Sequence, residues 1–173
     1  MVIGRPLFTV EQIQRRVKEL ADRISRDYEG KELLVVPLLK GAFMFASDLV
    51  REIQVPLRID FISTSSYVET DTTGQVTLHW GLREKVTGKD VLVVEDIADT
   101  GVTLDFVRKM LLEEKPRSLR ICAFLDKKER RIKNVSLDYV GFDIPNEYVV
   151  GYGLDYDDKF RNLPYIAIFK KKA

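Results

Sequence analysis

The stretch VLVVEDIADTGVT, residues 91–103, decides the fold class of this chain. Its first four residues are apolar without alternation, which predicts a strand buried on both faces of a sheet. A polar segment, 95–103, follows, and apolar residues at helical spacing come after it (Phe106, Val107, Met110 and Leu111). Because ligands of open parallel sheets bind beyond the carboxyl ends of the strands, the polar segment is the first candidate site.

The polar segment suits two kinds of ligand group. A helix start offers unpaired N–H groups and hydroxyls, which favour a phosphate, and a glycine there permits close approach of the backbone. The residues at this helix start are Asp99, Thr100, Gly101, Val102 and Thr103. Carboxylates that faced a phosphate would repel it, so residues 99–103 are predicted to surround phosphate. Glu95 and Asp96 are predicted to face hydroxyl groups or a metal ion.

A capped helix start is the alternative to a phosphate site, because acidic residues near a helix N-terminus also stabilise its dipole. Capping accounts for Asp99 or Thr103 but does not call for two adjacent acids at the end of a strand. The glycine and lysine spacing of a Walker loop is absent, and so is the Rossmann fingerprint.

Apolar periodicity elsewhere predicts alternating strands and helices. A helix begins after a Thr9 cap, with Gln12 three residues on, and ends at Gly30. The other predicted elements are strands over 33–38, 57–62, 76–80, 91–94 and 119–125, helices over 42–53 and from 106 to near 116, a polar loop over 63–74, and short β segments over 139–142, 148–152 and 165–169. The strand over 57–62 is predicted to bury Leu57, Ile59 and Phe61. This order implies a parallel sheet with helices on both faces and a small C-terminal cap.

Composition narrows the class of protein. The chain has 173 residues with 28 Lys and Arg against 27 Asp and Glu, which predicts one domain over residues 1–173 and gives no charge argument for a nucleic-acid partner. One Cys and one His argue against a disulfide framework and a Cys or His metal cluster. The apolar runs are of strand length and no signal peptide is visible, so we expect a cytoplasmic protein with no membrane partner.

The segment 95–103 resembles the phosphoribosyl pyrophosphate signature of type I phosphoribosyltransferases. It has the acidic pair Glu95-Asp96, then two residues, then Asp99-Thr100-Gly101, one further residue and Thr103. The acidic pair followed by Asp99 is similar to the 6-oxopurine branch, the hypoxanthine-guanine phosphoribosyltransferases. Four further segments agree in order and spacing, namely 39–41, 66–67, 125–127 and 149–156 with Arg161 behind it. The resemblance implies the α/β type I phosphoribosyltransferase fold, with a parallel central sheet flanked by helices and a small hood from the C-terminal and N-terminal parts.

The resemblance also implies a reaction. The 5-phosphoribosyl group of phosphoribosyl pyrophosphate is transferred to N9 of hypoxanthine or guanine, giving IMP or GMP and pyrophosphate, with Mg²⁺ as cofactor. Asp99 is then the general base toward the purine N7 proton. The other implied roles are ribose and 5′-phosphate binding (Glu95, Asp96, and Asp99 to Thr103), pyrophosphate binding (Lys40, Gly41, Arg161), purine binding (Lys127, Tyr148, Val149), Mg²⁺ ligation (Glu95, Asp96, Asp155) and a closing lid (Ser66, Tyr67).

Several of these residues have plainer interpretations on sequence alone. Lys40 also suits the solvated end of a buried strand, and Lys127 suits one more charge in the run 126–131. Tyr148, where family members often have Phe, also suits a packing role, and Asp155 with Arg161 suits a surface ion pair. The family's peptide bond at Leu39–Lys40 is often cis, which is the expectation here.

Two other functions stay open on sequence alone. A regulator could keep the fold and bind phosphoribosyl pyrophosphate as a signal, but 173 residues and a net charge of +1 argue against an added DNA-binding domain and against a basic RNA face. A phosphoribosyltransferase for another base is disfavoured by Lys127 and the block 148–155. The family commonly forms homodimers or homotetramers, which is the expectation for this chain.

Overall fold

The main sheet carries the candidate site at the carboxyl ends of its strands. The computed structural model describes residues 2–67 and 75–170, with only the backbone described at 2, 3, 66, 67 and 75. The helices are α1 (Val10–Asp27), α2 (Phe43–Glu52) and α3 (Val102–Glu113), with the 3-10 turn η1 (Lys128–Arg130). The strands are β1 (Val2–Phe8), β2 (Leu33–Leu39), β3 (Leu57–Ile59), β4 (Ile62–Tyr67), β5 (Gln75–Trp80), β6 (Asp90–Ala98), β7 (Ser118–Asp126), β8 (Tyr139–Asp143), β9 (Val149–Val150) and β10 (Ile166–Lys170).

Strand order in the main sheet is β5-β4-β2-β6-β7-β8, with β3 paired to β2. All pairs are parallel except β4 with the edge strand β5. The predicted parallel sheet is confirmed, and the two continuous apolar runs lie in neighbouring central strands, β2 and β6. Fully apolar strands occupy this position because both of their faces are covered.

Strand β6 continues through Ala98, which corrects the prediction that a loop begins at Glu95. The backbone pairing with β7 runs on from Glu95 opposite Ala123 to Ala98 opposite Asp126. The ladder of backbone hydrogen bonds, and not the polarity of the side chains, sets where this strand ends. Glu95 and Asp96 are therefore held on a strand, and the true loop is the short turn 99–101.

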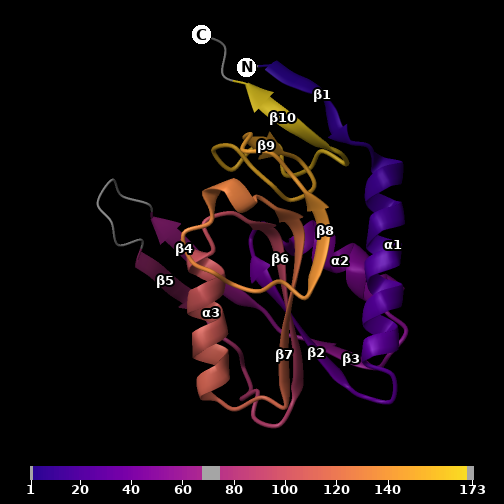
Figure 1. Ribbon diagram of the computed structural model, residues 1–173, viewed down its shortest axis with the longest axis vertical. Coiled ribbons are helices and arrows are strands. Elements are labelled where there is room, and N and C mark those ends of the chain that lie inside the picture. The colour runs from indigo at the N-terminus through magenta and orange to yellow at the C-terminus, as the bar shows by residue number, and fades with distance from the viewer. Residues whose placement is uncertain (1, 68–74, 171–173) are drawn as a thin grey trace.

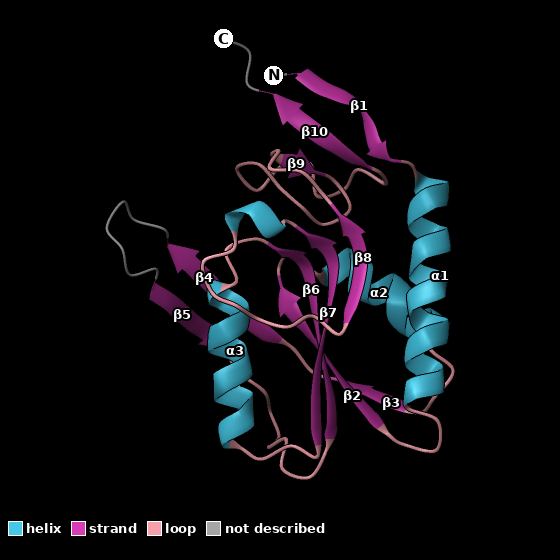
Figure 2. Ribbon diagram, viewed as in Figure 1, coloured by secondary structure: helices cyan, strands magenta, loops and turns pink. Residues whose placement is uncertain are grey.

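Helices cover both faces of the sheet, as predicted. Helices α1 and α2 lie against one face and α3 against the other (Figure 2). The predicted cap of α1 is confirmed, since Thr9 and Gln12 bond reciprocally to each other's backbone N–H groups. Among the described residues, no helix is both long enough and apolar enough to cross a membrane.

A small hood lies beyond the carboxyl ends of the main sheet (Figure 1). It is a sheet of order β1-β10-β9, so the N-terminal segment forms a strand that the sequence did not predict. The predicted β segment 139–142 is strand β8, which joins the main sheet beside β7 instead of the cap. The hood thus combines both ends of the chain and places the segment after β9 over the site.

Two predictions for the segment 57–74 were wrong. Strand β3 ends at Ile59, because the Asp60 carboxylate accepts the N–H groups of Phe61 and Arg83 at 2.8 and 2.7 Å and turns the chain. The alternation therefore breaks, and Ile59 and Phe61 are 43% and 42% exposed instead of buried. Part of the predicted polar loop forms strand β4, which pairs with β5, while residues 68–74 lie outside the described part of the chain.

Candidate active site

Three segments far apart in sequence meet around Gly41. A Cβ added to Gly41 would lie 1.9 Å from Asp96 Oδ2, and one added to Gly153 would lie 2.2 Å from the Gly41 carbonyl oxygen. The preceding peptide bond, Leu39–Lys40, is cis, as the resemblance implied. The end of β2, the acidic pair on β6 and the hood segment after β9 are thus in contact.

This close packing gives a test of the site. Gly41→Ala is expected to lower kcat/KM by about 100-fold, the size of effect that an ångström-scale displacement of catalytic groups has, because its Cβ must push the Asp96 carboxylate aside. Steady-state kinetics of the folded variant measure this. Gly81→Ala is the matched control, since its Cβ would make only a 3.7 Å contact with Leu78. Equal activity of the two variants would contradict the arrangement.

The acidic pair lies at the end of β6, with Glu95 buried and Asp96 half-buried. Glu95 is 8% exposed, its Oε1 accepts the N–H of Asp96 at 3.1 Å, and Asp96 Oδ1 accepts the N–H of Ile97 at 2.7 Å. Burial raises the pKa of the Glu95 carboxyl well above its ordinary range, and the charge of Asp96 adds to the shift. Burial also raises the pKa of Asp96. Carboxyl groups held this way gain from a cation or from hydroxyl donors.

The turn after β6 leads directly into α3. Gly101 is the residue before the helix, with φ +81°, and a Cβ there would lie 2.5 Å from the Lys133 carbonyl oxygen. Thr100 Oγ1 accepts the N–H of Val102 at 3.4 Å. A cavity of about 350 Å³ opens at this turn, lined by Glu95, Asp96, Ile97, Ala98, Asp99, Thr100, Gly101, Thr103, Leu104 and Arg130. The predicted phosphate residues thus surround one cavity at a helix N-terminus.

Asp99 lies between two basic side chains. Its Oδ2 is 3.4 Å from Arg130 Nη1 and 4.0 Å from Lys127 Nζ, while its Oδ1 is buried and has no hydrogen-bond partner among the described residues. Lys127 is only 4% exposed, and its N–H donates to the Ala98 carbonyl at 3.0 Å. Because Asp99 lines the cavity at the start of α3, its carboxylate is placed to take a proton from a ligand bound there.

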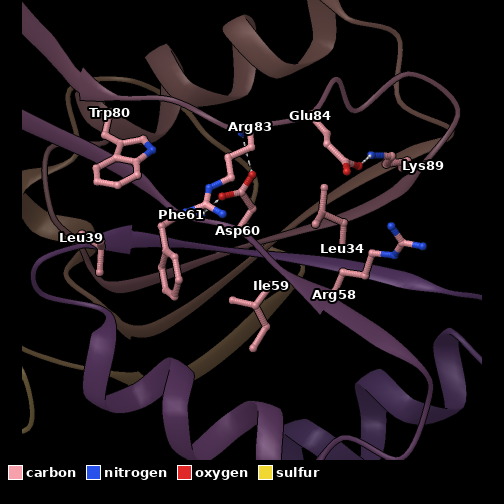
Figure 3. Close-up of a pocket in the computed structure, with 10 residues that line it drawn as sticks. All are labelled: Leu34, Leu39, Arg58, Ile59, Asp60, Phe61, Trp80, Arg83, Glu84 and Lys89. Atoms are coloured by element: carbon pink, nitrogen blue, oxygen red, sulfur yellow. Dashed lines mark hydrogen bonds and ion pairs between the residues drawn. The ribbon is translucent and has the colours of Figure 1, made fainter.

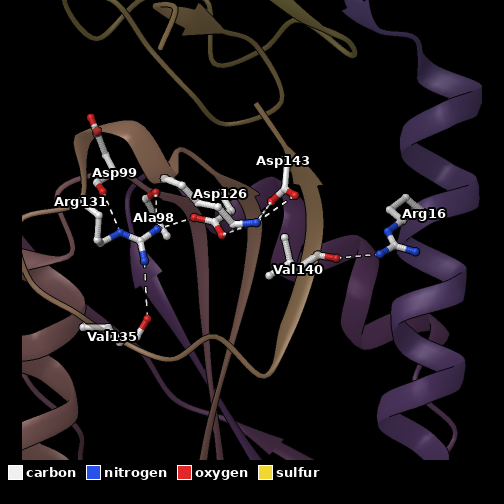
Figure 4. A network of polar contacts seen from close by, with 9 residues as sticks. Arg16, Ala98, Asp99, Asp126, Arg131, Val135, Val140 and Asp143 are labelled. Carbon is white, nitrogen blue, oxygen red and sulfur yellow. Dashed lines mark hydrogen bonds and ion pairs between the residues drawn. The ribbon is translucent and has the colours of Figure 1, made fainter. Parts of the chain in front are cut away.

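Arg131 is a residue that the sequence reasoning missed. Its guanidinium donates to the carbonyls of Asp99 and Ala98 at 3.0 and 3.1 Å and to the Asp126 carboxylate, and Figure 4 shows it at the centre of these contacts. Arg131 therefore fixes the backbone where β6 passes into the turn 99–101. The charge run 126–131 gave no signal for this, because such runs are usually solvated.

Lys40 and Arg161 meet at the hood. Lys40 Nζ lies 3.0 and 3.1 Å from the two carboxylate oxygens of Asp158, and Arg161 Nη2 lies 2.9 Å from both Asp158 Oδ1 and Asp155 Oδ1. Arg161 Nη1 also donates to the Gly153 carbonyl at 2.7 Å, while its buried Nε has no partner within the described part of the chain. The two cations expected to bind pyrophosphate thus share one carboxylate, Asp158, which the sequence did not single out.

The remaining predicted purine residues lie on the hood. Val149 is buried in β9, opposite Ile168 of β10. Tyr148 is 51% exposed, and its hydroxyl donates to the Asp155 carbonyl at 3.0 Å. Its ring packs near those of Tyr156 and Phe169, and its hydroxyl joins it to the segment that carries Asp155.

Comparison with known proteins identifies the family. The sequence pattern of the phosphoribosyl transferase domain matches residues 7–157, most of the chain. The chain belongs to the phosphoribosyltransferase family. It is 48% identical over 159 residues to the hypoxanthine phosphoribosyltransferase of Salmonella typhimurium, covering 90% of this chain and 89% of that protein. It is 47% identical to the hypoxanthine-guanine phosphoribosyltransferase of Staphylococcus aureus, over 96% and 94% of the two chains.

A solved structure shares the fold as well. The crystal structure of a hypoxanthine-guanine phosphoribosyltransferase from Bacillus anthracis superposes with a TM-score of 0.90 at 48% identity, covering 96% of this chain and 98% of that one. The type I phosphoribosyltransferase fold implied by the sequence is confirmed. These relatives place this phosphoribosyltransferase in the hypoxanthine-guanine branch of the family.

Phosphoribosyltransferases generally need a divalent metal ion, and the donor set here fits one. The adjacent carboxyl groups of Glu95 and Asp96 offer oxygen ligands, which hard cations prefer, and a cation would offset the cost of ionising them. Within residues 2–67 and 75–170, no three Asp, Glu, His or Cys side chains gather at one metal position. A cation at this phosphoribosyltransferase site would take its other ligands from substrate and water.

Proposed function

We propose that this chain transfers the 5-phosphoribosyl group of phosphoribosyl pyrophosphate to N9 of hypoxanthine or guanine, forming the nucleoside monophosphate and pyrophosphate. The observation that carries the proposal is Asp99. Its carboxylate lies beside the buried Lys127 and borders the cavity at the start of α3. A proton acceptor, a carbonyl-binding donor and a phosphate-binding turn thus lie together.

The ribose and its 5′-phosphate bind at the end of β6. Residues 99–103 bind the phosphate through the N–H groups and hydroxyls at the start of α3. Glu95 and Asp96 bind the ribose hydroxyls and, with Asp155 at a second position, Mg²⁺. When bound, Mg²⁺ supplies positive charge that stabilises the departing pyrophosphate.

Pyrophosphate binds at Lys40, Gly41 and Arg161. The convergence of both cations on Asp158 supports this assignment, because it brings them within the span of one anionic group. Bond exchange then occurs at C1′. The bond from C1′ to the pyrophosphate oxygen breaks, with the electron pair leaving on pyrophosphate, while purine N9 bonds to C1′ and Asp99 takes the N7 proton.

The purine binds between the hood and β7. Lys127 donates to its 6-oxo group, Tyr148 stacks on its ring, and the backbone of Val149 meets its edge. The half-exposed ring of Tyr148 supports the stacking role. Ser66 and Tyr67, at the end of β4, are assigned to a lid that excludes water when it closes.

A spectrophotometric assay tests the proposed function. With phosphoribosyl pyrophosphate, Mg²⁺ and each purine in turn, we expect turnover with hypoxanthine or guanine and little with adenine. Binding of phosphoribosyl pyrophosphate without turnover of any purine would favour the regulator instead. The single domain over residues 1–173 and the cytoplasmic location stay predictions from the sequence.

We also propose that the chain forms a homodimer or homotetramer through an exposed apolar face. Ile59, Phe61 and Trp80 are 43%, 42% and 58% exposed and line one cavity, with charged residues of both signs around them (Figure 3). Phe43, 38% exposed, lines an adjoining apolar cavity. In a twofold dimer the same surface of each chain meets its own copy. A face that carries exposed apolar side chains and charges of both signs can therefore complement itself, which suits a second copy of the chain.

Trp80→Lys tests this face. Because it places a charge in the centre of a self-complementary contact, we expect the variant to sediment as a smaller species than the unmodified chain at the same concentration. Leu112→Lys, at a 42% exposed apolar position on α3, is the matched control and should leave the oligomer unchanged. An unmodified chain that is monomeric at every concentration would refute the proposal.

A further inference from the structure

The segment 127–133 is fixed alongside the phosphate turn by backbone hydrogen bonds. The N–H of Lys127 donates to the Ala98 carbonyl at 3.0 Å, and those of Ile132 and Lys133 donate to the Thr100 carbonyl at 2.8 and 3.0 Å. With a Cβ at Gly101 only 2.5 Å from the Lys133 carbonyl, the two backbones are in direct contact. The position of each side chain on this segment relative to the turn is therefore well determined.

Three basic residues of this segment have different surroundings. Lys127 is buried beside Asp99, and Arg131 is occupied by backbone carbonyls and Asp126. Arg130 is 46% exposed in its side chain, and its one polar contact given by the described residues is with Asp99 Oδ2, at 3.4 Å. Among the basic residues of the segment 127–133, Arg130 is the one that lines the cavity at the start of α3.

The charges around the cavity single out Arg130. The cavity is lined by three acidic residues, Glu95, Asp96 and Asp99. Arg130 is the one basic residue among the described residues that line this cavity. A phosphate that enters this cavity brings two further negative charges. Helix N–H groups alone offer only partial positive charge, so a full cation at the same cavity is the natural partner of the phosphate.

We propose that Arg130 binds the 5′-phosphate, exchanging its contact with Asp99 for the incoming phosphate oxygens. The inference rests on the proposed function, since it takes a phosphoribosyl group as the ligand. The inference adds to the 5′-phosphate site a residue that lies outside the signature segment 95–103. The exchange also removes one cation from the Asp99 carboxylate, which must accept a proton in the reaction, so filling the phosphate site prepares the base.

Calorimetric binding of IMP and of inosine, which lacks only the phosphate, tests this role. Arg130→Ala is expected to weaken IMP binding by roughly 10–100-fold, the range for a hydrogen bond to a charged group, and to leave inosine binding unchanged, because inosine has no phosphate for Arg130 to contact. Arg130→Lys should restore part of the IMP affinity, because it keeps the charge but not the two-pronged geometry. Lys128→Ala is the matched control, since it removes the same charge from a neighbouring side chain that pairs with Asp143.

The outcomes separate this inference from the proposed function. An equal loss of IMP and inosine affinity in Arg130→Ala would mean that Arg130 only supports the turn, and would overturn the inference while leaving the proposed function in place. The same result from Lys128→Ala as from Arg130→Ala would reduce the effect to general electrostatics and would also overturn it. An unmodified chain that binds neither compound would overturn the proposed function and the inference together.

Discussion

Asp99→Asn is expected to lower kcat by about 10²–10⁴-fold, the usual contribution of a general base, while substrate dissociation constants change far less. The amide has the shape of the carboxylate but cannot take the N7 proton. Its neighbours, Lys127 and Arg130, still line the site, so binding surfaces persist. Single-turnover kinetics with saturating substrates separate the chemical step from binding.

Asp143→Asn is the control for this substitution. Asp143 also pairs with a lysine of the adjoining segment, Lys128, at 2.9 Å, but it lies at the end of β8 and does not line the cavity at α3. We expect it to keep the kcat of the unmodified chain. Wild-type turnover in Asp99→Asn with both hypoxanthine and guanine would remove Asp99 from proton transfer.

Much of the fold was predictable because burial leaves a pattern in the sequence. The unbroken apolar runs of β2 and β6 indicated central strands, and the Thr9 cap indicated where α1 begins. The wrong predictions concern where strands end, which depends on backbone hydrogen bonding and leaves no pattern of side chains in the sequence. Strand β6 continues through polar residues because β7 pairs with it, and Asp60 ends β3 partly through a hydrogen bond to Arg83, 23 residues away in the sequence.

The candidate site divides in the same way. Residues 95–103 were predictable because their chemistry is concentrated in one short stretch. Arg130, Arg131 and Asp158 were not, because each acts on partners from another segment, and a charged residue in a charged run gives no sign of its partner. At Ile59 and Phe61 the prediction failed for a different reason. The apolar alternation indicated burial, but both side chains are exposed in the single chain.

Lys127→Ala is expected to lower kcat/KM with hypoxanthine and guanine strongly while changing the small activity with adenine little. An ammonium group has donors only, so it can bond the 6-oxo group but not the 6-amino group of adenine. Lys127 is 4% exposed, so adenine would leave a buried cation facing another donor. Sites built to bond one polar group reject analogues that lack it by up to ~10⁴–10⁵-fold.

The ratio of kcat/KM for hypoxanthine to that for adenine, measured in both proteins, is the decisive quantity. Loss of Lys127 also removes a cation 4.0 Å from Asp99, but any effect on Asp99 as proton acceptor applies to every purine alike and cancels in the ratio. A narrowed ratio therefore reports recognition of the 6-oxo group alone. Lys128→Ala, which alters an exposed neighbour, should leave the ratio unchanged. An unchanged ratio in Lys127→Ala would instead assign the discrimination to the backbone groups around Val149, which donate and accept at fixed positions whatever side chain occupies residue 127.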